Sequence, residues 1–443
     1  MSEQVAVLGA GLAGLAAAGK ARELGLQVDL YEKHPYVGGH AYSHDVEGFT
    51  FDEGPHVSFT KRPEIQALLA DALEGDFLEH RSVITNYWNG HVITHPAQTN
   101  LHGLPVDVVE RCILGFVEAR YADDQPVETY ADWCRQGLGQ AFADEFTFRY
   151  TRKYWTTEAA NMSTEWVGNR MYPPKLEEVV RGALAPSPEG ANHHYLTGYR
   201  YPRTGGFGSY VRAVSRGQQV HSEHDLVSVD LRARKLEFAN GRAAHFDSLI
   251  NTIPVPELVK RIVDVPAHVR EAAEKLVCTS VEVINVGLGR DEGYPEAHWM
   301  YFYDEDTLFS RANLPHRLSP YNVPAGCGSI QLEVYHSRYK PLPVEDVLSR
   351  TMEDLVKEGL LHPGDDVRVA QRQSIRYANV LFDLARAENL RVVQDWLSGH
   401  GVVPAGRYGE WAYLWTDDSI VSGWAAAERV AGGGGAALGG AEA

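Results

Sequence analysis

Hydrophobic positions near the start of the chain fall first in a compact run and then in an alanine- and leucine-rich stretch. Residues 4–8 (QVAVL) form a short apolar run typical of a buried strand. The next segment, GAGLAGLAAAGKARELG, favours a helix, and residues 27–33 (QVDLYEK) indicate a second strand. The pattern therefore predicts a β-α-β unit at the beginning of the chain.

The middle of the chain changes character twice. Residues 63–74 fit a helix, and the stretch from about 104 to 190 combines helical periodicity with many aromatic residues, which indicates an inserted helical domain. Residues 201–214 read as a glycine turn leading into a helix. Residues 221–254 alternate as a β-meander with an Asn-Gly turn that ends in a buried strand.

The last third mixes long strands with helices. We expect strands at VEVINVGLG (281–289) and SIQLEVYHS (329–337), and an amphipathic helix at VEDVLSRTMEDLVKEGL (344–360). A helix of small residues, SIVSGWAAAERVA (419–431), follows a turn. No internal repeat is visible. The alternation of helices and strands predicts an α/β fold.

Length and charge narrow the class of protein. A chain of 443 residues, 44% hydrophobic and 23% charged, is long enough for a large core and for two or three interleaved domains. The formal charge of −18 argues against nucleic acid as a partner, because such binding depends on neutralising phosphates. A small anionic substrate stays compatible, since a few arginines in a cleft set the local field.

The cysteines and the two ends of the chain point to a cytoplasmic protein. The four cysteines show neither metal-ligand spacing nor a disulfide framework, so we expect reduced thiols and no metal site. The first residues lack the features of a signal peptide, and no apolar run reaches the roughly 18 residues that a membrane span needs. The glycine-rich tail, residues 432–443, is expected to be disordered.

Three glycines give the first chemical signal. Gly9, Gly11 and Gly14 form G-x-G-x-x-G between the first strand and the first helix. Gly9 permits the tight turn, Gly11 lets the backbone approach a pyrophosphate, and Gly14 lets the helix pack on the strand. Glu32 ends the second strand, where a carboxylate can accept from ribose hydroxyls. The spacing predicts a dinucleotide site, the alternative being an ordinary tight turn.

Two further segments refine this prediction. Gly38 and Gly39 follow Glu32, an extension typical of flavoproteins, which favours FAD over NAD; the alternative is a plain loop. In FDEGPHVSFT (51–60), a strand is broken at Gly54-Pro55 and then presents His56. Asp52 is expected to brace that turn. His56 is either a site residue or a buried histidine that hydrogen-bonds to the backbone.

Arginines and aromatic residues form a second set of candidates. Arg170, Arg311 and Arg407 lie beside aromatic or turn residues and have no acidic partner at i,i+4. A guanidinium suits a diphosphate, which it binds through two parallel hydrogen bonds, whereas the alternative for any one of the three taken singly is a structural ion pair. The aromatic candidates fit either the core or a wall that stacks on a sugar or base: Trp155, Tyr301, Tyr377 and Tyr413.

These motifs together resemble the UDP-galactopyranose mutases, especially the eukaryotic-type branch of that flavoprotein family. GAGLAGLAAA and VGGHAYS resemble the FAD-binding start of the family, and FDEGPHVSFT resembles its histidine segment, with Pro55 in place of a second glycine. The helical part is similar in RYTRKYWTTEAANMSTEWVGNRMYPPKLEEVV, where Thr151 stands at the position of the family's asparagine. HWMYFYDED, FSRANLPHRLSPYN and GRYGEWAYLWTDDSIVSGWAAAERV are the most specific matches.

The resemblance implies a particular architecture. It implies a Rossmann-like FAD-binding domain of the GR2 type with an inserted helical domain and an antiparallel-sheet substrate domain. The FAD-binding parts are expected at residues 1–100, 191–285 and 396–431. The helical substrate domain is expected at 101–190 and the sheet domain at 286–395.

The resemblance also implies an activity and a role for each candidate residue. The activity is a pyranose/furanose ring isomerisation of a nucleoside-diphosphate sugar at N5 of reduced FAD, without net oxidation. Arg170 and Arg311 would bind the diphosphate, and His56 would lie against the flavin. The other implied contacts are Arg407, Gly54 and Asp417 for the cofactor, and Trp155, Tyr301, Tyr377 and Tyr413 for the substrate.

Other functions stay open at this point. An FAD-dependent oxidoreductase of the amine oxidase or protoporphyrinogen oxidase type shares the fold and differs in the pocket. Such an enzyme needs few arginines in its cleft when its substrate is apolar. A non-catalytic flavin-binding protein is a third hypothesis. An external reductant such as NAD(P)H and assembly into a homo-oligomer are compatible with the mutase reading.

Overall fold

A five-stranded parallel sheet is built from parts of the chain that lie far apart in sequence. The computed structural model describes residues 3–123, 125–186 and 197–432. The strand order is β19-β13-β1-β2-β9, and all four strand pairs are parallel. The strands are β1 (Gln4–Leu8), β2 (Gln27–Tyr31), β9 (Val220–His221), β13 (Ser248–Asn251) and β19 (Val402–Pro404). This sheet confirms the predicted Rossmann-like α/β fold.

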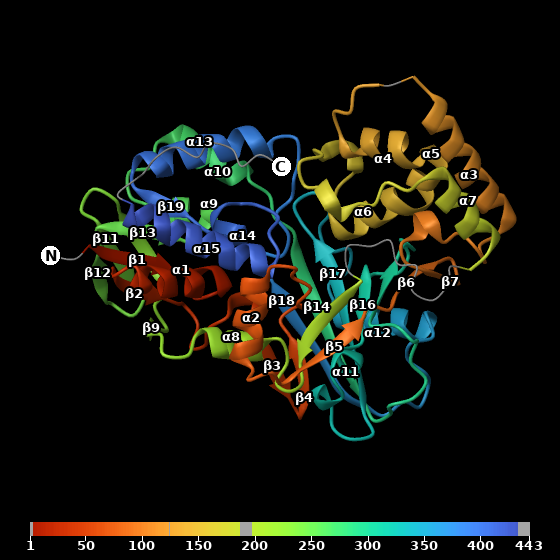
Figure 1. The fold of residues 1–443 in the computed structure, drawn as a ribbon, viewed down its shortest axis with the longest axis horizontal. Helices are drawn as coiled ribbons and strands as arrows, with labels where there is room; N and C mark the ends of the chain where they lie inside the picture. Colours follow the sequence, from red (N-terminus) through yellow and green to blue (C-terminus); the bar gives the residue numbers. More distant parts are fainter. Residues whose placement is uncertain (1–2, 124, 187–196, 433–443) are drawn as a thin grey trace.

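Helices α1 (Leu12–Glu23) and α15 (Thr416–Ala431) come from opposite ends of the chain and pack side by side at this sheet, as Figure 1 shows. Their backbones come very close, because a Cβ on Gly423 of α15 would lie 2.2 Å from the carbonyl oxygen of Ala13 on α1. Leu15, Ala17 and Ile420 are fully buried in the core between them. The two ends of the chain are thereby held together.

A larger, mixed sheet forms the second layer of the molecule. Its order is β18-β14-β17-β16-β15-β6-β7, with antiparallel pairs except for the parallel pair β15–β6. The antiparallel-sheet domain that the resemblance implies is thus present, with one parallel pair that joins β6 to it. The strands are β6 (Ile84–Trp88), β7 (His91–Thr94), β14 (Ser280–Leu288), β15 (Trp299–Phe302), β16 (Arg311–Asn313), β17 (Gly328–His336) and β18 (Val367–Ile375).

A cluster of helices covers the end of this sheet near β6 and β7, in orange and yellow in Figure 1. Its helices are α3 (Val106–Tyr121), α4 (Tyr130–Leu138), α5 (Gln140–Phe142), α6 (Phe148–Tyr154) and α7 (Leu176–Leu184), with one π-helical turn at Ala143–Thr147. Trp88 of β6, Phe146 and Tyr303 share one buried apolar cluster. That cluster fixes the helices against the sheet edge.

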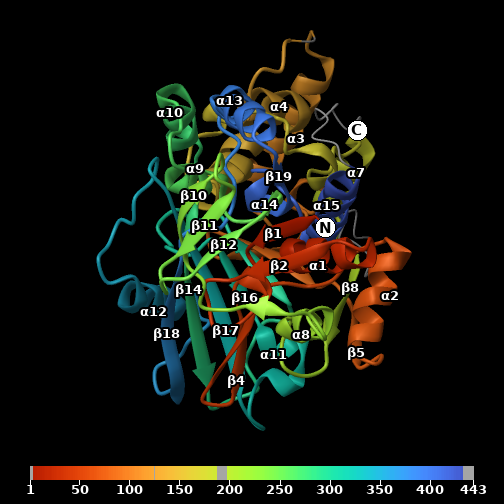
Figure 2. The same ribbon diagram turned by 90° about the vertical axis from the view of Figure 1, so that its left-hand side faces the viewer.

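Shorter elements connect these layers, and Figure 2 shows α10 and α13 lying together on one side of the molecule. The remaining strands are β3 (Ser43–Val46), β4 (Phe49–Asp52), β5 (Phe77–Arg81), β8 (Gly198–Pro202), β10 (Leu226–Asp230), β11 (Lys235–Phe238) and β12 (Ala243–His245). The remaining helices are α2 (Pro63–Ala72), α8 (Gly208–Val214), α9 (Val255–Arg261), α10 (Ala267–Lys275), α11 (Pro315–Leu318), α12 (Val347–Lys357), α13 (Arg386–Gly399) and α14 (Gly406–Gly409).

Several sequence predictions can be compared with these elements. The predicted meander is confirmed as the antiparallel strands β10, β11 and β12. The tail expected to be disordered lies outside the described residues apart from Gly432. Among the residues that the structure describes, no helix has the length and apolar character required to cross a bilayer. The residue boundaries expected for the five domain parts stay predictions.

Candidate functional site

The turn between β1 and α1 is built around the predicted glycines. Gly9 has a φ of +94°, which disfavours a side chain there. A Cβ on Gly14 would lie 1.8 Å from the carbonyl oxygen of Gly9, so only glycine lets the helix approach the turn this closely. Gly11 is the N-cap of α1, and no side chain caps the helix start. The first amides of α1 are thus available to an anion.

Glu32 closes this turn from the end of β2. Its buried carboxylate accepts from the backbone N–H of Ala10 at 2.8 Å and of His34 at 3.0 Å. Gly38, with a φ of +120°, donates its N–H to the carbonyl of Ala10 at 2.8 Å. The two glycine segments predicted from the sequence therefore lie against each other. A carboxylate oxygen can accept a second hydrogen bond, so Glu32 can also receive a ribose hydroxyl.

The broken strand carries two titratable groups whose pKa values are shifted in opposite directions. The carboxylate of Asp52 accepts from the hydroxyls of Ser43 (2.6 Å) and Tyr201 (2.8 Å) and from the N–H of Phe207 (2.9 Å), and its complete burial raises its pKa to about 6. The imidazole Nδ1 of His56 is 2.7 Å from the carbonyl oxygen of Gly54, and burial lowers the pKa of His56 to about 4. Asp52 braces the turn, and His56 is neutral near pH 7.

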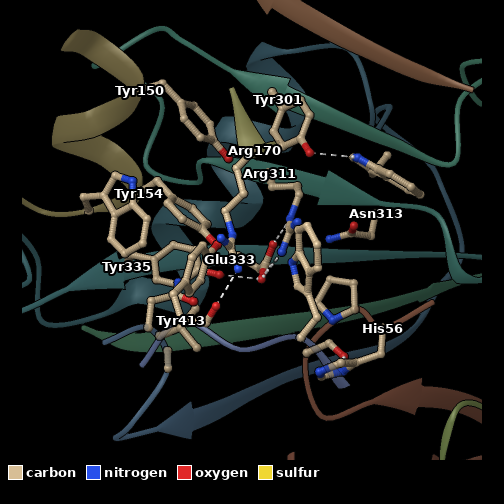
Figure 3. Close-up of a pocket in the computed structure, with 18 of the residues that line it drawn as sticks. His56, Tyr150, Tyr154, Arg170, Tyr301, Arg311, Asn313, Glu333, Tyr335 and Tyr413 are labelled. Atoms are coloured by element: carbon tan, nitrogen blue, oxygen red, sulfur yellow. Dashed lines mark hydrogen bonds and ion pairs between the residues drawn. The ribbon is translucent and has the colours of Figure 1, made fainter. Parts of the chain in front are cut away.

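A cavity of about 350 Å³ opens beside this segment. Its walls come from the His56 segment, from the helical cluster, from the seven-stranded sheet and from the chain between α14 and α15. Figure 3 shows His56 together with Arg170, Arg311 and five of the lining tyrosines: Tyr150, Tyr154, Tyr301, Tyr335 and Tyr413. Aromatic side chains make up a large part of the wall, and the charged groups are set among the rings.

Arg311 has a carboxylate partner that its local sequence does not reveal. Arg311 on β16 lies directly opposite Glu333 on β17. Its Nε donates to one carboxylate oxygen of Glu333, and its Nη2 donates to the other at 2.8 Å. Tyr335 donates its hydroxyl to the same carboxylate at 2.7 Å. Arg311 thus forms the ion pair that the sequence left open as an alternative, and its partner lies on the neighbouring strand rather than at i,i+4.

Arg170 is held by rings and carbonyl groups. Its guanidinium lies 4.6 Å from the ring centre of Tyr413 and 4.5 Å from that of Trp415. Nη1 donates to the carbonyl of Trp166 at 3.3 Å and Nη2 to the carbonyl of Tyr413, whereas the buried Nε has no hydrogen-bond partner among the described residues. No ion pair joins Arg170 to a carboxylate in the described part of the chain. Its positive charge therefore remains available to a bound anion.

Arg407 also lines the cavity, and its side chain is fixed by backbone groups. Nε and Nη2 donate to the carbonyl of Leu414 at 2.9 and 2.6 Å, and Nη1 lies 3.3 Å from the carbonyl of Ala378. The guanidinium lies 5.2 Å from the ring centre of Tyr413. Arg407 therefore brings a third positive charge to the cavity in a rigid position.

Comparison with known proteins decides the family. Residues 12–431 match the model of the flavin containing amine oxidoreductases. The chain belongs to this family. As a member of the flavin containing amine oxidoreductases it uses FAD, which confirms the predicted cofactor.

Individual relatives of this chain differ in what they do. It is similar to a reduced UDP-galactopyranose mutase, with a TM-score of 0.90, 27% identity, and 98% and 96% of the two chains covered. A 4,4'-diapolycopene oxygenase from Methylomonas sp is 25% identical over 75% of each chain. A 4,4'-diaponeurosporene oxygenase from Staphylococcus aureus (strain Mu50 / ATCC 700699) is 39% identical over 57 residues, 13% of this chain and 12% of that protein. The predicted resemblance to the mutase family is confirmed.

The protein offers a cradle that fits FAD. The close approach of Gly14 to Gly9 and the uncapped start of α1 suit a pyrophosphate, and the carboxylate of Glu32 suits a ribose. Gly38 and Gly39 both have positive φ values and lie against this turn, so that a ligand can approach their backbone. These residues would hold the dinucleotide half of the cofactor.

Apart from the glycines and Glu32 of the dinucleotide cradle, two predicted site residues do not line the cavity. Tyr377 donates its hydroxyl to Glu257 at 2.7 Å and lies behind the wall, so the structure does not place it with the substrate candidates. Asp417, in the first turn of α15, lies 4.0 Å from Arg62, and its contact with the cofactor stays a prediction. Trp155, Tyr301, Tyr413 and Gly54 all line the cavity, and their contacts with substrate or cofactor stay predictions.

Several residues that line the cavity were not predicted from the sequence. Tyr150 and Tyr154 are one helical turn apart on α6, and Glu333 and Tyr335 are two residues apart on β17. Spacings of four in a helix and two in a strand place side chains on one face. Once one member of each pair had been assigned to the cavity, this periodicity would have predicted that the other member lines it too.

The shifted pKa of His56 gives a test of its environment. An unfolded chain protonates His56 near pH 6.5, whereas the folded protein resists protonation until about pH 4. Stability is therefore lost as the pH falls from 6.5 to 4, and His56→Gln should remove a loss on the order of 2 kcal/mol. Urea unfolding of wild type and variant at pH 7.5 and pH 4.5 measures how much stability each protein loses between the two pH values. Asp52 is unchanged and contributes equally in both proteins, so its effect cancels in the comparison. An identical pH dependence in both proteins would contradict the assigned environment.

Proposed function

We propose that this protein is a flavin-dependent mutase that isomerises the sugar ring of a nucleoside-diphosphate sugar. The observation that carries the proposal is the set of three guanidinium groups in one cavity, those of Arg170, Arg311 and Arg407, beside the neutral imidazole of His56. Structural likeness to UDP-galactopyranose mutase over nearly the whole chain supports it. A cavity for an apolar oxidase substrate has no need of three guanidinium groups.

The chemistry of the lining residues agrees with this proposal. Among the described residues that line the cavity there is no serine, cysteine, lysine or aspartate. The two lining carboxylates are already engaged, Glu333 by Arg311 and Tyr335 and Glu53 by His40 and His44, so neither is placed as a free nucleophile toward the substrate. Bound in its reduced form, FAD supplies an electron-rich ring nitrogen, N5, which can serve as the nucleophile.

The protein's own residues bind and orient the substrate. Arg170 and Arg311 would bind the diphosphate and stabilise the negative charge that develops on it as it leaves the sugar. Tyr413 is positioned by its 3.1 Å hydroxyl contact with Tyr154. Trp155, buried against Trp166, would exclude water from the far end of the cavity. The neutral imidazole of His56 would pack beside the flavin without adding a charge.

An anaerobic assay tests the proposal. The purified protein is reduced with dithionite and offered UDP-, dTDP- and GDP-hexoses, and ring isomers are separated by chromatography. We expect isomerisation with reduced protein and none with oxidised protein. The absence of any ring isomer with every sugar nucleotide would contradict the mutase assignment.

An FAD-dependent oxidoreductase is the second candidate. It is favoured by the 25% identity to the 4,4'-diapolycopene oxygenase over 75% of the chain and by the aromatic wall of the cavity. The same apparatus separates the two functions. Substrate-driven bleaching of oxidised flavin, with a product changed by two electrons, would support the oxidoreductase. Redox-neutral products formed only with reduced flavin would support the mutase.

A further inference from the structure

The carboxylate of Glu333 is an unexpected group in a cavity assigned to an anion. Glu333 lines the cavity with only 2% of its surface exposed. Both of its oxygens are occupied by Arg311, and one of them also accepts from Tyr335. The Nη1 nitrogen of Arg311 lies outside this bidentate contact. Arg311 can therefore donate to a ligand while Glu333 offsets its charge.

The charges around the cavity are nearly balanced. Among the described lining residues, three guanidinium groups, those of Arg170, Arg311 and Arg407, face two carboxylates, those of Glu53 and Glu333. Glu53 is occupied by histidines, at 2.8 Å from His40 and 3.3 Å from His44. Of the two carboxylates, Glu333 is therefore the one that pairs directly with Arg311, a residue proposed to bind the diphosphate. An anion bound at Arg311 meets its repulsion at short range.

We propose that Glu333 determines how tightly the cavity holds a diphosphate, by acting as a counter-charge to Arg311. The inference rests on the proposed function and adds to it the residue that limits affinity. A mutase must release the diphosphate from the sugar carbon and then return it to the same carbon. Excess affinity for the free diphosphate would stabilise the state between these two steps and slow the return.

A purely structural role makes the opposite prediction. If Glu333 only orients Arg311, its loss lets the guanidinium move and weakens diphosphate binding. If Glu333 is a counter-charge, its neutral isostere strengthens binding, because the cavity gains one unit of positive charge without losing volume. The sign of the change in affinity therefore separates the two roles.

The test is calorimetric titration of the FAD-loaded protein with UDP and with inorganic pyrophosphate, which has no base. For Glu333→Gln we expect at least tenfold tighter binding of both ligands, equivalent to about 1.4 kcal/mol. We also expect a steeper loss of affinity with added salt, since more of the binding is electrostatic. Unchanged or weaker binding by a folded variant overturns the proposal.

A matched control comes from the same sheet. Glu282 on β14 is 3% exposed and pairs with Arg372 on β18 at 2.8 Å, but it does not line the cavity. Glu282→Gln removes a buried, paired carboxylate away from the ligand. We expect UDP affinity within about twofold of wild type for this variant. A gain equal to that of Glu333→Gln would assign the effect to net charge rather than to Glu333, which overturns the proposal.

A double variant decides the matter if Glu333→Gln fails to fold. Removing one partner of a buried ion pair is strongly destabilising, whereas replacing both partners is often tolerated. Arg311→Met with Glu333→Gln removes both partners, so no buried charge is left unpaired. If Glu333 offsets Arg311, the charges removed cancel, and we expect the double variant to bind pyrophosphate within about fivefold of wild type. A loss of about 100-fold would show that Arg311 acts with its full charge, which overturns the proposal.

Failure of the proposed function has a different signature. Wild-type protein that binds neither UDP nor pyrophosphate would contradict the diphosphate site itself and, with it, the role of Glu333. Wild-type protein that binds both, combined with no gain on removal of Glu333, leaves the mutase proposal intact and overturns the counter-charge alone. Bound FAD, measured by its visible absorbance, confirms that each variant is folded.

Discussion

Gly14→Ala is expected to produce a protein that retains almost no FAD. The added Cβ would lie 1.8 Å from the carbonyl oxygen and 3.0 Å from the carbonyl carbon of Gly9, both of them backbone atoms. Relief requires α1 to move away from the β1–α1 turn. That movement separates the helix start from the turn that Glu32 closes, and so disrupts the pyrophosphate cradle. Overpacking of this kind costs about 1–3 kcal/mol or more in stability as well.

The measurement is the ratio of flavin to protein absorbance after purification, before and after incubation with added FAD. Gly19→Ala is the matched control, because Gly19 lies on the same helix and its added Cβ would meet only the side-chain amide of Gln218 at 3.4 Å. That variant should keep its flavin and gain about 0.5–1 kcal/mol of stability from the removal of a helical glycine. Full flavin content in Gly14→Ala would contradict the proposed cradle.

The dinucleotide part could be predicted from sequence because its signals are local. Gly9, Gly11 and Gly14 lie within six residues, and each is required by backbone geometry that the motif itself specifies. The strand, the helix and the second strand follow directly. The parallel sheet, however, also takes β13 and β19 from distant segments. Their buried hydrophobic pattern indicates strands but not which neighbours they pair with.

The charge state of the cavity could not be predicted, because it depends on strand register. Arg311 and Glu333 are 22 residues apart and meet only because β16 and β17 pair in one particular register. A shift of that register by one residue would turn Glu333 to the other face of the sheet. The sequence showed an arginine without a local acidic partner. The fold supplies the partner, and the proposed counter-charge follows from it.

The aromatic residues illustrate the same limit. Tyr377 and Tyr413 looked equally suitable in sequence, yet only Tyr413 lines the cavity, whereas Tyr377 turns toward Glu257. Tyrosine is common in cores, so composition does not separate a wall residue from a core residue. Strands β6 and β7 present a related case, because they precede the helical cluster in sequence and join the seven-stranded sheet only at its far edge.

Arg170→Ala is expected to weaken binding of UDP to the FAD-loaded protein by about 100-fold, which corresponds to about 2.7 kcal/mol. Arg170 has no carboxylate partner among the described residues, so its charge is not offset within the cavity. Hydrogen bonds to charged groups contribute about 1.5–3 kcal/mol each, and a guanidinium can supply two of them to a diphosphate. The contacts with Tyr413 and Trp415 hold the guanidinium in place before the ligand arrives.

Calorimetric titration with UDP measures this effect, and two further variants define its origin. Arg170→Lys should recover only part of the affinity, because an ammonium group keeps the charge but cannot offer a planar pair of donors. Arg200→Ala is the control, since Arg200 also stacks on a ring, 4.7 Å from the centre of Phe77, but lies outside this cavity. If Arg170→Ala binds UDP as wild type does, the role of Arg170 is only structural, as a cation that packs against Tyr413 and Trp415. Binding of the diphosphate would then depend on Arg311, whose charge Glu333 already offsets. Such weak binding of the leaving group would argue against the mutase proposal.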